Sequence, residues 1–319
     1  MSRLAAWAAI LLLASASAWA QGWPARPVRL VIAFPPGGPA DIIGRAMAQK
    51  LGDAFAQPFV VDNRPGGNAN IGAEIAAKAP ADGYTLLLLT STHATNVSLY
   101  RGLRYDVLKD FVPVARLATF PLVLVVHPLV KARSVQELIR LAKAQPGQLA
   151  YASAGSGGGA HLAAESFKAA AGVDLLHVPY KGTGPAVQDV LAGQVGIMFA
   201  SVPAVVGQVK VGKLIALGVT SARASSALPG VAPIAEAGLA NYDLASWFGL
   251  VAPAGVPPEV VSRINAEVVR ILAGAEFAQR LQTEGGEPAP ASPSEFGRFI
   301  RVEIDRWSEI VRRSGARVE

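Results

Sequence analysis

Ser153 and the histidines that follow it are the residues with which this chain could carry out covalent chemistry. Ser153 stands in "YASAG", at a predicted turn from a strand to a helix, where the nucleophile elbow of a hydrolase places its serine. The first glycine of that motif is missing, and the later histidines are His161 and His177. Asp174 and His177 are three residues apart on a predicted strand, so their side chains should point to opposite faces. A catalytic triad is therefore not expected, and a serine hydrolase using Ser153 is kept as an alternative.

Motifs for a cofactor or a metal are equally incomplete. "GSGGGA" at 155–160 fits a dinucleotide fingerprint, but the acid that should end the next strand is Asp174, which begins it. "GQVKVGKL" at 207–214 resembles a phosphate-binding loop, but it lacks the Ser or Thr after its lysine and leads into a strand. The chain has no cysteine, and its histidines at 93, 127, 161 and 177 lack metal-ligand spacing. We expect no cofactor and no metal.

Two glycine-rich loops are the more informative feature. "FPPGGPAD" at 34–41 follows an apolar strand, and Pro39 suits the first position of a helix, with Gly37 and Gly38 just ahead of it. The first N–H groups of a helix lack partners and its dipole is positive there, so such a loop can hold an anion with main chain alone. "SAGSGGGA" at 153–160 repeats the device. For the first loop the alternative is a tight turn in which Asp41 caps its own helix.

Apolar runs alternate with helical patterns along the chain, which favours an α/β fold. Because the strands are apolar throughout, we expect a parallel sheet covered on both faces. Strands are predicted at residues 28–34, 58–63, 84–90, 149–153, 174–180, 195–200 and 214–220, and helices at 41–51, 71–79, 161–171, 185–192 and 203–211.

A long apolar stretch at 111–128 separates the two series of elements and is predicted to be a crossover. Since both series open with a glycine-rich loop, we expect two similar α/β domains. "SWFGLVAPAG" at 246–255 is predicted to be a strand that returns to the first domain. Ser292 and Glu295 form a capping box before a terminal amphipathic helix.

The first twenty residues have the pattern of a secretory signal peptide. Arg3 precedes an apolar core too short to span a bilayer, and "AWA" is a cleavage pattern that ends at Ala20. No later stretch is apolar enough to span, so the mature protein should be soluble. Removing Arg3 lowers the formal net charge from +6 to +5. The basic residues are scattered, which argues against nucleic-acid binding.

At the glycine loops the chain closely resembles the tripartite tricarboxylate transporter receptors, the Bug family of periplasmic solute-binding proteins. The resemblance runs through nearly the whole mature chain, in family order. Small departures are "NVSLY", where the family commonly has a proline, and the unusually glycine-rich second loop. The matching segments are "FPPGGPAD", "VVDNRPGGNANIGAE", "ADGYTLL", "DFVPVA", "AQPGQLAYASAGSGGGAHLAAE", "HVPYKGTGPAVQD" and "WFGLVAPAGVP".

The resemblance implies a two-lobed type II periplasmic binding fold that closes over a small carboxylate, held mainly by backbone amides and ordered waters. Lobe 1 would comprise residues 21–120 and 225–319, and lobe 2 residues 121–224. The implied ligand-binding positions come from both loops and from other strand ends. They are Phe34, Pro35, Gly37, Gly38, Asp41, Thr90, Ser91, Thr92, Ser153, Ala154, Gly155, Ser156, Gly157, His161, Tyr180, Lys181, Thr183, Ala200 and Ser201.

The implied role is that of a periplasmic receptor, not an enzyme, that hands its ligand to a two-subunit membrane permease. We expect it to act as a monomer. Mono-, di- and tricarboxylates, aromatic acids and amino acids all remain possible ligands, because main-chain amides recognise the carboxylate alone. A sensory protein that signals to a membrane partner is a second reading, and an exported serine hydrolase a third.

Overall fold

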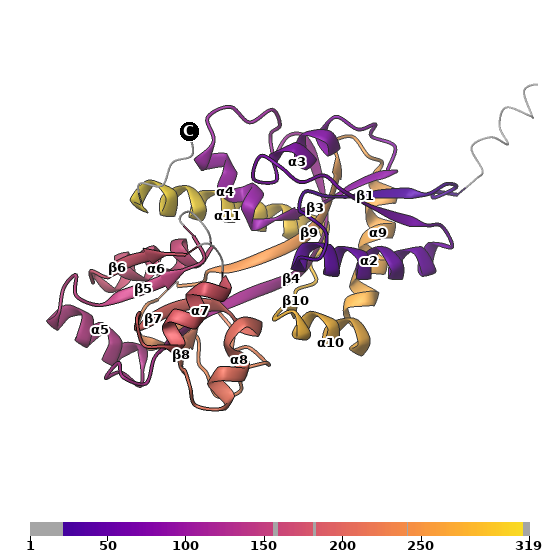
Figure 1. Cartoon of the computed structure of the whole chain (residues 1–319). Helices are drawn as coiled ribbons and strands as arrows, with labels where there is room; N and C mark the ends of the chain where they lie inside the picture. Colours follow the sequence, from indigo (N-terminus) through magenta and orange to yellow (C-terminus); the bar gives the residue numbers. More distant parts are fainter. Residues whose placement is uncertain (1–21, 156–158, 181–182, 241, 315–319) are drawn as a thin grey trace, which may run out of the picture.

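The computed structural model describes residues 22–155, 159–180, 183–240 and 242–314. Within these residues ten strands form one mixed sheet, which is divided between two lobes (Figure 1). The predicted signal peptide lies outside the described residues. The strands are β1 (Val28–Ile32), β2 (Phe59–Asn63), β3 (Thr85–Thr90), β4 (Phe111–Val126), β5 (Ala150–Ser153), β6 (Leu176–Pro179), β7 (Ile197–Ser201), β8 (Ile215–Val219), β9 (Ala245–Pro253) and β10 (Glu287–Pro288).

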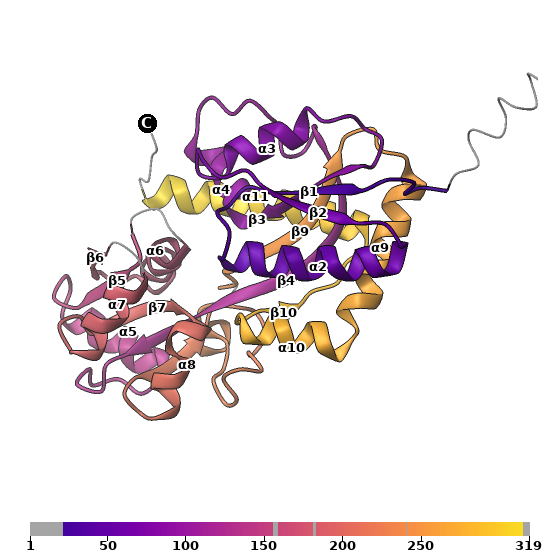
Figure 2. The same ribbon diagram turned by 45° about the vertical axis from the view of Figure 1, so that its right-hand side comes forward.

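Helices cover the sheet in both lobes, as the alternating pattern predicts. The first lobe contains β1, β2 and β3, and the second contains β5 to β8 (Figure 2). The helices are α2 (Pro39–Phe55), α3 (Asn70–Ala77), α4 (Ser91–Leu99), α5 (Val135–Ala144), α6 (Gly159–Ala171), α7 (Thr183–Leu191), α8 (Val202–Lys210), α9 (Pro258–Leu272), α10 (Ala275–Thr283) and α11 (Pro293–Ser314), with a 3-10 helix η1 (Ile234–Ala237).

Strand β1 explains how the first lobe packs. Its side chains alternate between two cores: Leu30 and Ile32 pack with Met47 of α2, while Val31 packs with Ala73 of α3. Because both faces are covered, the strand is apolar along its whole length. β1 pairs in parallel with β2 and β3, so the carboxyl ends of these strands meet at one edge.

The predicted crossover at 111–128 is wrong, because this segment is the strand β4. Up to Pro121 it pairs antiparallel with β9. From Leu122 to Val126 it pairs antiparallel with β7 and β8 of the second lobe. The sheet is therefore mixed instead of parallel. Prolines are rare inside a sheet, so Pro113 and Pro121 make the sequence atypical of a strand. A register shift between Pro113 and Ala115 accommodates the first of them.

The prediction that 246–255 forms a strand returning to the first lobe is confirmed. β9 pairs antiparallel with β3 on one side and with β4 on the other. Its Trp247 is fully buried and donates an indole N–H to Glu303 of α11 at 2.9 Å, and Trp307 donates to the same carboxylate at 3.1 Å. Burial raises the pKa of Glu303, an effect that the neighbouring Arg306 opposes.

Helix α11 begins as predicted and contacts both lobes. Ser292 N–H donates to the Glu295 carboxylate at 2.8 Å, and Glu295 N–H donates back to the Ser292 hydroxyl at 3.3 Å. The apolar face of the helix is buried against α4 and α6, which belong to different lobes. In the part of the chain that the structure describes, no helix is both long and apolar enough to cross a membrane.

His93 lies in the first turn of α4 and is fully buried. Its Nδ1 atom accepts the Thr90 N–H at 3.1 Å, while the Thr90 side chain accepts the N–H of His93, which makes a capping box. Burial lowers the pKa of His93 to about 4. The neutral ring is therefore the form that the folded state requires at neutral pH.

We predict that this histidine makes the protein sensitive to acid. As the pH falls from about 6.5 towards 4, the unfolded chain takes up the proton first, and up to about 3 kcal/mol of stability is lost. His93→Gln retains the capping box without a titrating ring, so its stability should fall less over that range. His93→Leu should be less stable than His93→Gln at every pH, since it also lacks the cap. Urea unfolding at pH 8 and pH 5 measures this, and an unchanged loss in His93→Gln would contradict the assignment.

Candidate functional site

A cavity of about 270 Å³ lies where the two lobes meet. It brings together five of the predicted positions, namely Phe34, Thr90, Ser91, Thr92 and Ser201. The first four follow or end strands β1 and β3, and Ser201 ends β7 of the second lobe. These strands present their carboxyl ends to the cavity, which is where α/β sheets bind ligands.

The amino-terminal ends of three helices line this cavity. They are the first turns of α2 at Pro39 and Ala40, of α4 at Ser91 and Thr92, and of α8 at Val202. A helix start carries unpartnered N–H groups and the positive end of the helix dipole. Among the described residues that line the cavity, Glu284 is the only charged one. Among these lining residues, the groups with positive character are therefore main-chain ones at the helix starts.

Asp41 organises the first glycine loop instead of facing the cavity. It is buried, and its carboxylate accepts the Gly37 N–H at 2.9 Å, Asn63 Nδ2 at 2.8 Å and Arg45 Nε at 3.0 Å. Burial alone would raise the pKa of Asp41, but these hydrogen bonds outweigh it and the pKa is lowered. Asp41 thus ties down the turn before its own helix.

Few main-chain donors of this loop are left for a ligand. Pro35, Pro36 and Pro39 have no N–H, and the N–H of Gly37 is taken by Asp41. The first helical hydrogen bond runs from Ile42 N–H to Gly38 O at 2.9 Å. The N–H groups that precede it, at Gly38, Ala40 and Asp41, are the donors placed at the helix start.

The second glycine loop is built around Ser153, at the end of β5. Ser153 is fully buried, and its Oγ lies 2.7 Å from His177 Nε2. The same oxygen donates to Gly155 O at 3.1 Å and accepts Gly155 N–H at 3.2 Å. Tyr180 N–H donates to Ser153 O at 2.9 Å, and Tyr180 OH to Asp189 at 2.7 Å. The serine hydroxyl therefore holds its own loop.

The remaining predicted positions have different surroundings. Ala154 and Pro35 are exposed, Thr183 begins α7, and Ala200 is buried in the core of the second lobe. His161, in the first turn of α6, stacks on His177 with 4.2 Å between ring centroids. Ser156, Gly157 and Lys181 lie outside the described residues. A Cβ built on Gly159 would stand 3.8 Å from Ser246 Oγ, which places the start of α6 at the rim of the cavity.

Sequence reasoning missed the residues that the crossing strands contribute. Because 111–128 is expected to be a crossover, Phe120 of β4 goes unnoticed, as does Phe248 of β9. Their ring centroids are 4.5 Å apart, and both residues line the cavity. The pair Gly285–Gly286 is a signal of close backbone approach, and Gly285 does lie against Pro203. The lining residues outside the predicted set are Pro39, Ala40, Phe120, Pro121, Leu122, Val202, Pro203, Ser246, Phe248, Glu284 and Gly285.

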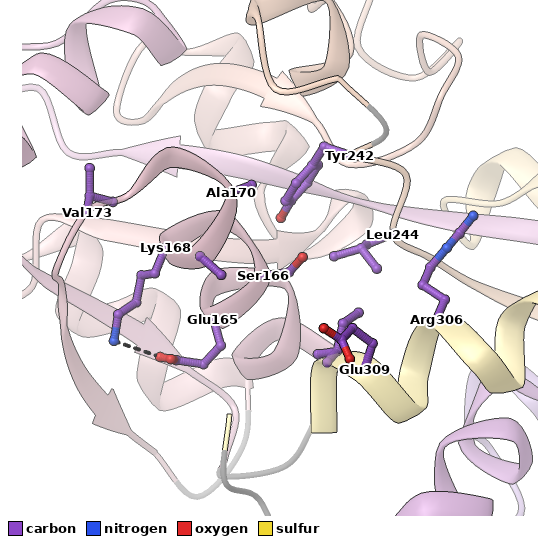
Figure 3. Close-up of a pocket in the computed structure, with 11 residues that line it drawn as sticks. Glu165, Ser166, Lys168, Ala170, Val173, Tyr242, Leu244, Arg306 and Glu309 are labelled. Carbon is purple, nitrogen blue, oxygen red and sulfur yellow. Dashed lines mark hydrogen bonds and ion pairs between the residues drawn. The ribbon is translucent and has the colours of Figure 1, made fainter. Parts of the chain in front are cut away.

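A larger cavity of about 600 Å³ lies between α6 and α11 (Figure 3). Its basic side chains already have partners: Lys168 pairs with Glu165 at 3.0 Å, and Arg306 donates to Asp243 O at 2.6 Å. It is therefore a weaker candidate for binding an anion. No group of three or more His, Asp or Glu side chains within the described residues is placed to hold a metal ion.

Comparison with known proteins identifies the family and the fold of the chain. Residues 43–316 match the model of the tripartite tricarboxylate transporter family receptor. The protein BugT of Bordetella pertussis is 38% identical over 94% of this chain and 93% of its own length. The structure of R. palustris Rpa4515 with adipate has a TM-score of 0.74 at 38% identity, covering 92% of this chain and 98% of that one. MatC from Rhodopseudomonas palustris with bound malate has a TM-score of 0.70 at 30% identity, covering 91% and 100%.

The fold is accordingly the two-lobed one of the periplasmic binding proteins. With a family match over most of its length and relatives at this identity, the chain belongs to the tripartite tricarboxylate transporter receptors, of the Bug type.

Proposed function

We propose that this chain is a periplasmic receptor that captures a small dicarboxylate between its lobes and delivers it to a tripartite tricarboxylate-type permease. The observation that carries the proposal is the meeting of three helix starts at one cavity, whose described lining residues include no lysine or arginine. Each helix start offers N–H donors and about half a positive charge. Two similar proteins bind dicarboxylates, adipate in one case and malate in the other.

The lining also suits the remainder of such a ligand. Phe34, Phe120 and Phe248 provide apolar walls for a carbon skeleton. The hydroxyls of Ser91, Thr92 or Ser246 can donate to carboxylate oxygens. The first loop would supply its Gly38 and Ala40 amides, and the second loop would approach from the other lobe, where Gly159 faces Ser246.

Closure of the lobes would bring the two loops together. The proposed boundary in β4 is at 120/121, with lobe 1 formed by 21–120 and 225–319 and lobe 2 by 121–224. The pairing partners of β4 change one residue later, between Pro121 and Leu122, which supports a boundary in this part of the strand. The proposal also includes export with cleavage of the signal peptide after Ala20. The receptor would act as a monomer, and its permease would have two subunits. A sensory role would use the same cavity and differ only in the membrane partner.

Binding without catalysis is proposed despite the short contact between Ser153 and His177. Such a contact would suit a nucleophile and its base. However, Ser153 is 0% exposed, and its hydroxyl also bonds with both polar groups of the Gly155 backbone. Asp174 precedes β6, and its Oδ1 atom lies 3.8 Å from Lys168 Nζ. This aspartate therefore pairs with a lysine and is not placed as the acid of a triad.

We predict that the carboxylate groups decide affinity. In titration calorimetry, adipate or malate should bind with a 1:1 stoichiometry, and adipamide should bind at least a hundredfold more weakly than adipate, since helix starts attract negative charge. NMR after prolonged incubation should show the ligand unchanged. Equal binding of adipate and adipamide, or no binding of either dicarboxylate, would overturn the proposed site chemistry. Conversion of the ligand would favour the enzyme alternative.

We also predict that a negative charge built into the cavity blocks binding. Thr92 lies in the first turn of α4, where aspartate is favourable to the helix, so Thr92→Asp should fold normally. Its carboxylate would occupy the positive helix end and repel the ligand, and the affinity for adipate should fall at least tenfold. Thr92→Asn has nearly the same shape without the charge and should stay within about threefold of wild type. Wild-type affinity in Thr92→Asp would place the carboxylate elsewhere.

A further inference from the structure

We propose that His177 is a positioning residue for ligand binding, which acts through the Ser153 hydroxyl to fix the main chain of Gly155, next to the end of β5. The inference rests on the proposed function, because the loop matters only if its main chain meets the ligand. His177 belongs to β6, outside the glycine loop, and lies at neither of the two helix starts of the first lobe.

The register of β5 and β6 brings the histidine to the serine. The two strands are parallel, and Tyr151 lies directly opposite His177. Since side chains alternate along a strand, Tyr151, Ser153 and His177 share one face of the sheet. His177 Nε2 then reaches Ser153 Oγ at 2.7 Å.

Two neighbouring rings hold the imidazole in its orientation. His177 is stacked between Tyr151 at 4.9 Å and His161 at 4.2 Å, with interplanar angles of 14° and 12°. Tyr151 is itself fixed, because its hydroxyl donates to Glu165 of α6 at 2.7 Å. Burial lowers the pKa of His177, and His161 and then Lys168 also lower it, while Glu165 opposes the shift. The ring is therefore neutral at pH 7 and cannot turn freely.

The Ser153 hydroxyl in turn holds the backbone of Gly155. Its Oγ bonds with both the N–H and the C=O of Gly155, a residue with a φ of +141° that lies outside any strand or helix. A site made of main-chain donors needs its backbone set before the ligand arrives, because ordering it on binding costs affinity. The chain of contacts from His177 through Ser153 to Gly155 supplies that order.

The test compares variants of the full chain by calorimetry with adipate and by hydrogen exchange without ligand at residues 151–155. In His177→Leu the amides of Ser153, Ala154 and Gly155 should exchange faster, and the affinity for adipate should fall about tenfold. In His177→Gln, whose amide can still bond with Ser153, both readouts should stay within about threefold of wild type. His127→Leu is the matched control. His127 directly follows β4, one residue beyond the Val126–Ile197 pair, and its Nδ1 atom accepts the Leu129 N–H at 3.2 Å, so this variant should change neither readout.

A double-mutant cycle decides whether the effect passes through the serine. In a Ser153→Ala background, His177→Leu should cause little additional loss. Additive losses, equal losses in His177→Leu and His177→Gln, or unchanged exchange in both would overturn the proposal. If exchange responds as expected but the wild-type chain does not bind adipate, the positioning role stands and the proposed dicarboxylate ligand fails.

Discussion

The pairing of β4 with β9 is the constraint on which the rest of the structure depends. β4 pairs with β9 in the first lobe and, beyond Pro121, with β7 and β8 in the second. The two strands therefore join the lobes and also supply Phe120 and Phe248 to the cavity between them. Trp247 of β9 is in turn anchored to Glu303 of α11, a helix that contacts both lobes. Any relative motion of the lobes has to be absorbed by these few elements.

In the proposed binding mode, the recognition of charge is separate from the recognition of shape. Helix starts and loop amides attract an anion wherever it carries a carboxylate, and they are indifferent to what the carboxylate is attached to. Asp41 illustrates the cost of such an arrangement. It takes up the Gly37 N–H to hold the turn, so that loop has fewer donors to offer a ligand. Selectivity is left to the apolar and hydroxyl side chains that line the remaining space.

Much of this could be predicted from local patterns. The apolar runs at β1 and β3, the capping box at Ser292 and the first glycine loop are short-range signals. The structure has strands at the two runs, and α11 and α2 begin at the other two places. The prediction of a crossover at 111–128 is wrong. Pro113 and Pro121 are atypical of a strand, but β-bulges and pairing on both sides maintain β4 through them. No local signal marks a strand that belongs to two lobes.

The sequence by itself determined which segments could present bare main chain to an anion, because proline and glycine act on their own backbone. Only the tertiary structure decided which of those N–H groups are already used, and by what. The contact between Ser153 and His177 joins residues 24 positions apart, and it exists because β5 and β6 pair in parallel with Tyr151 opposite His177. Strand register is a property of the assembled sheet, so the partners of a side chain follow from it and not from their spacing along the chain.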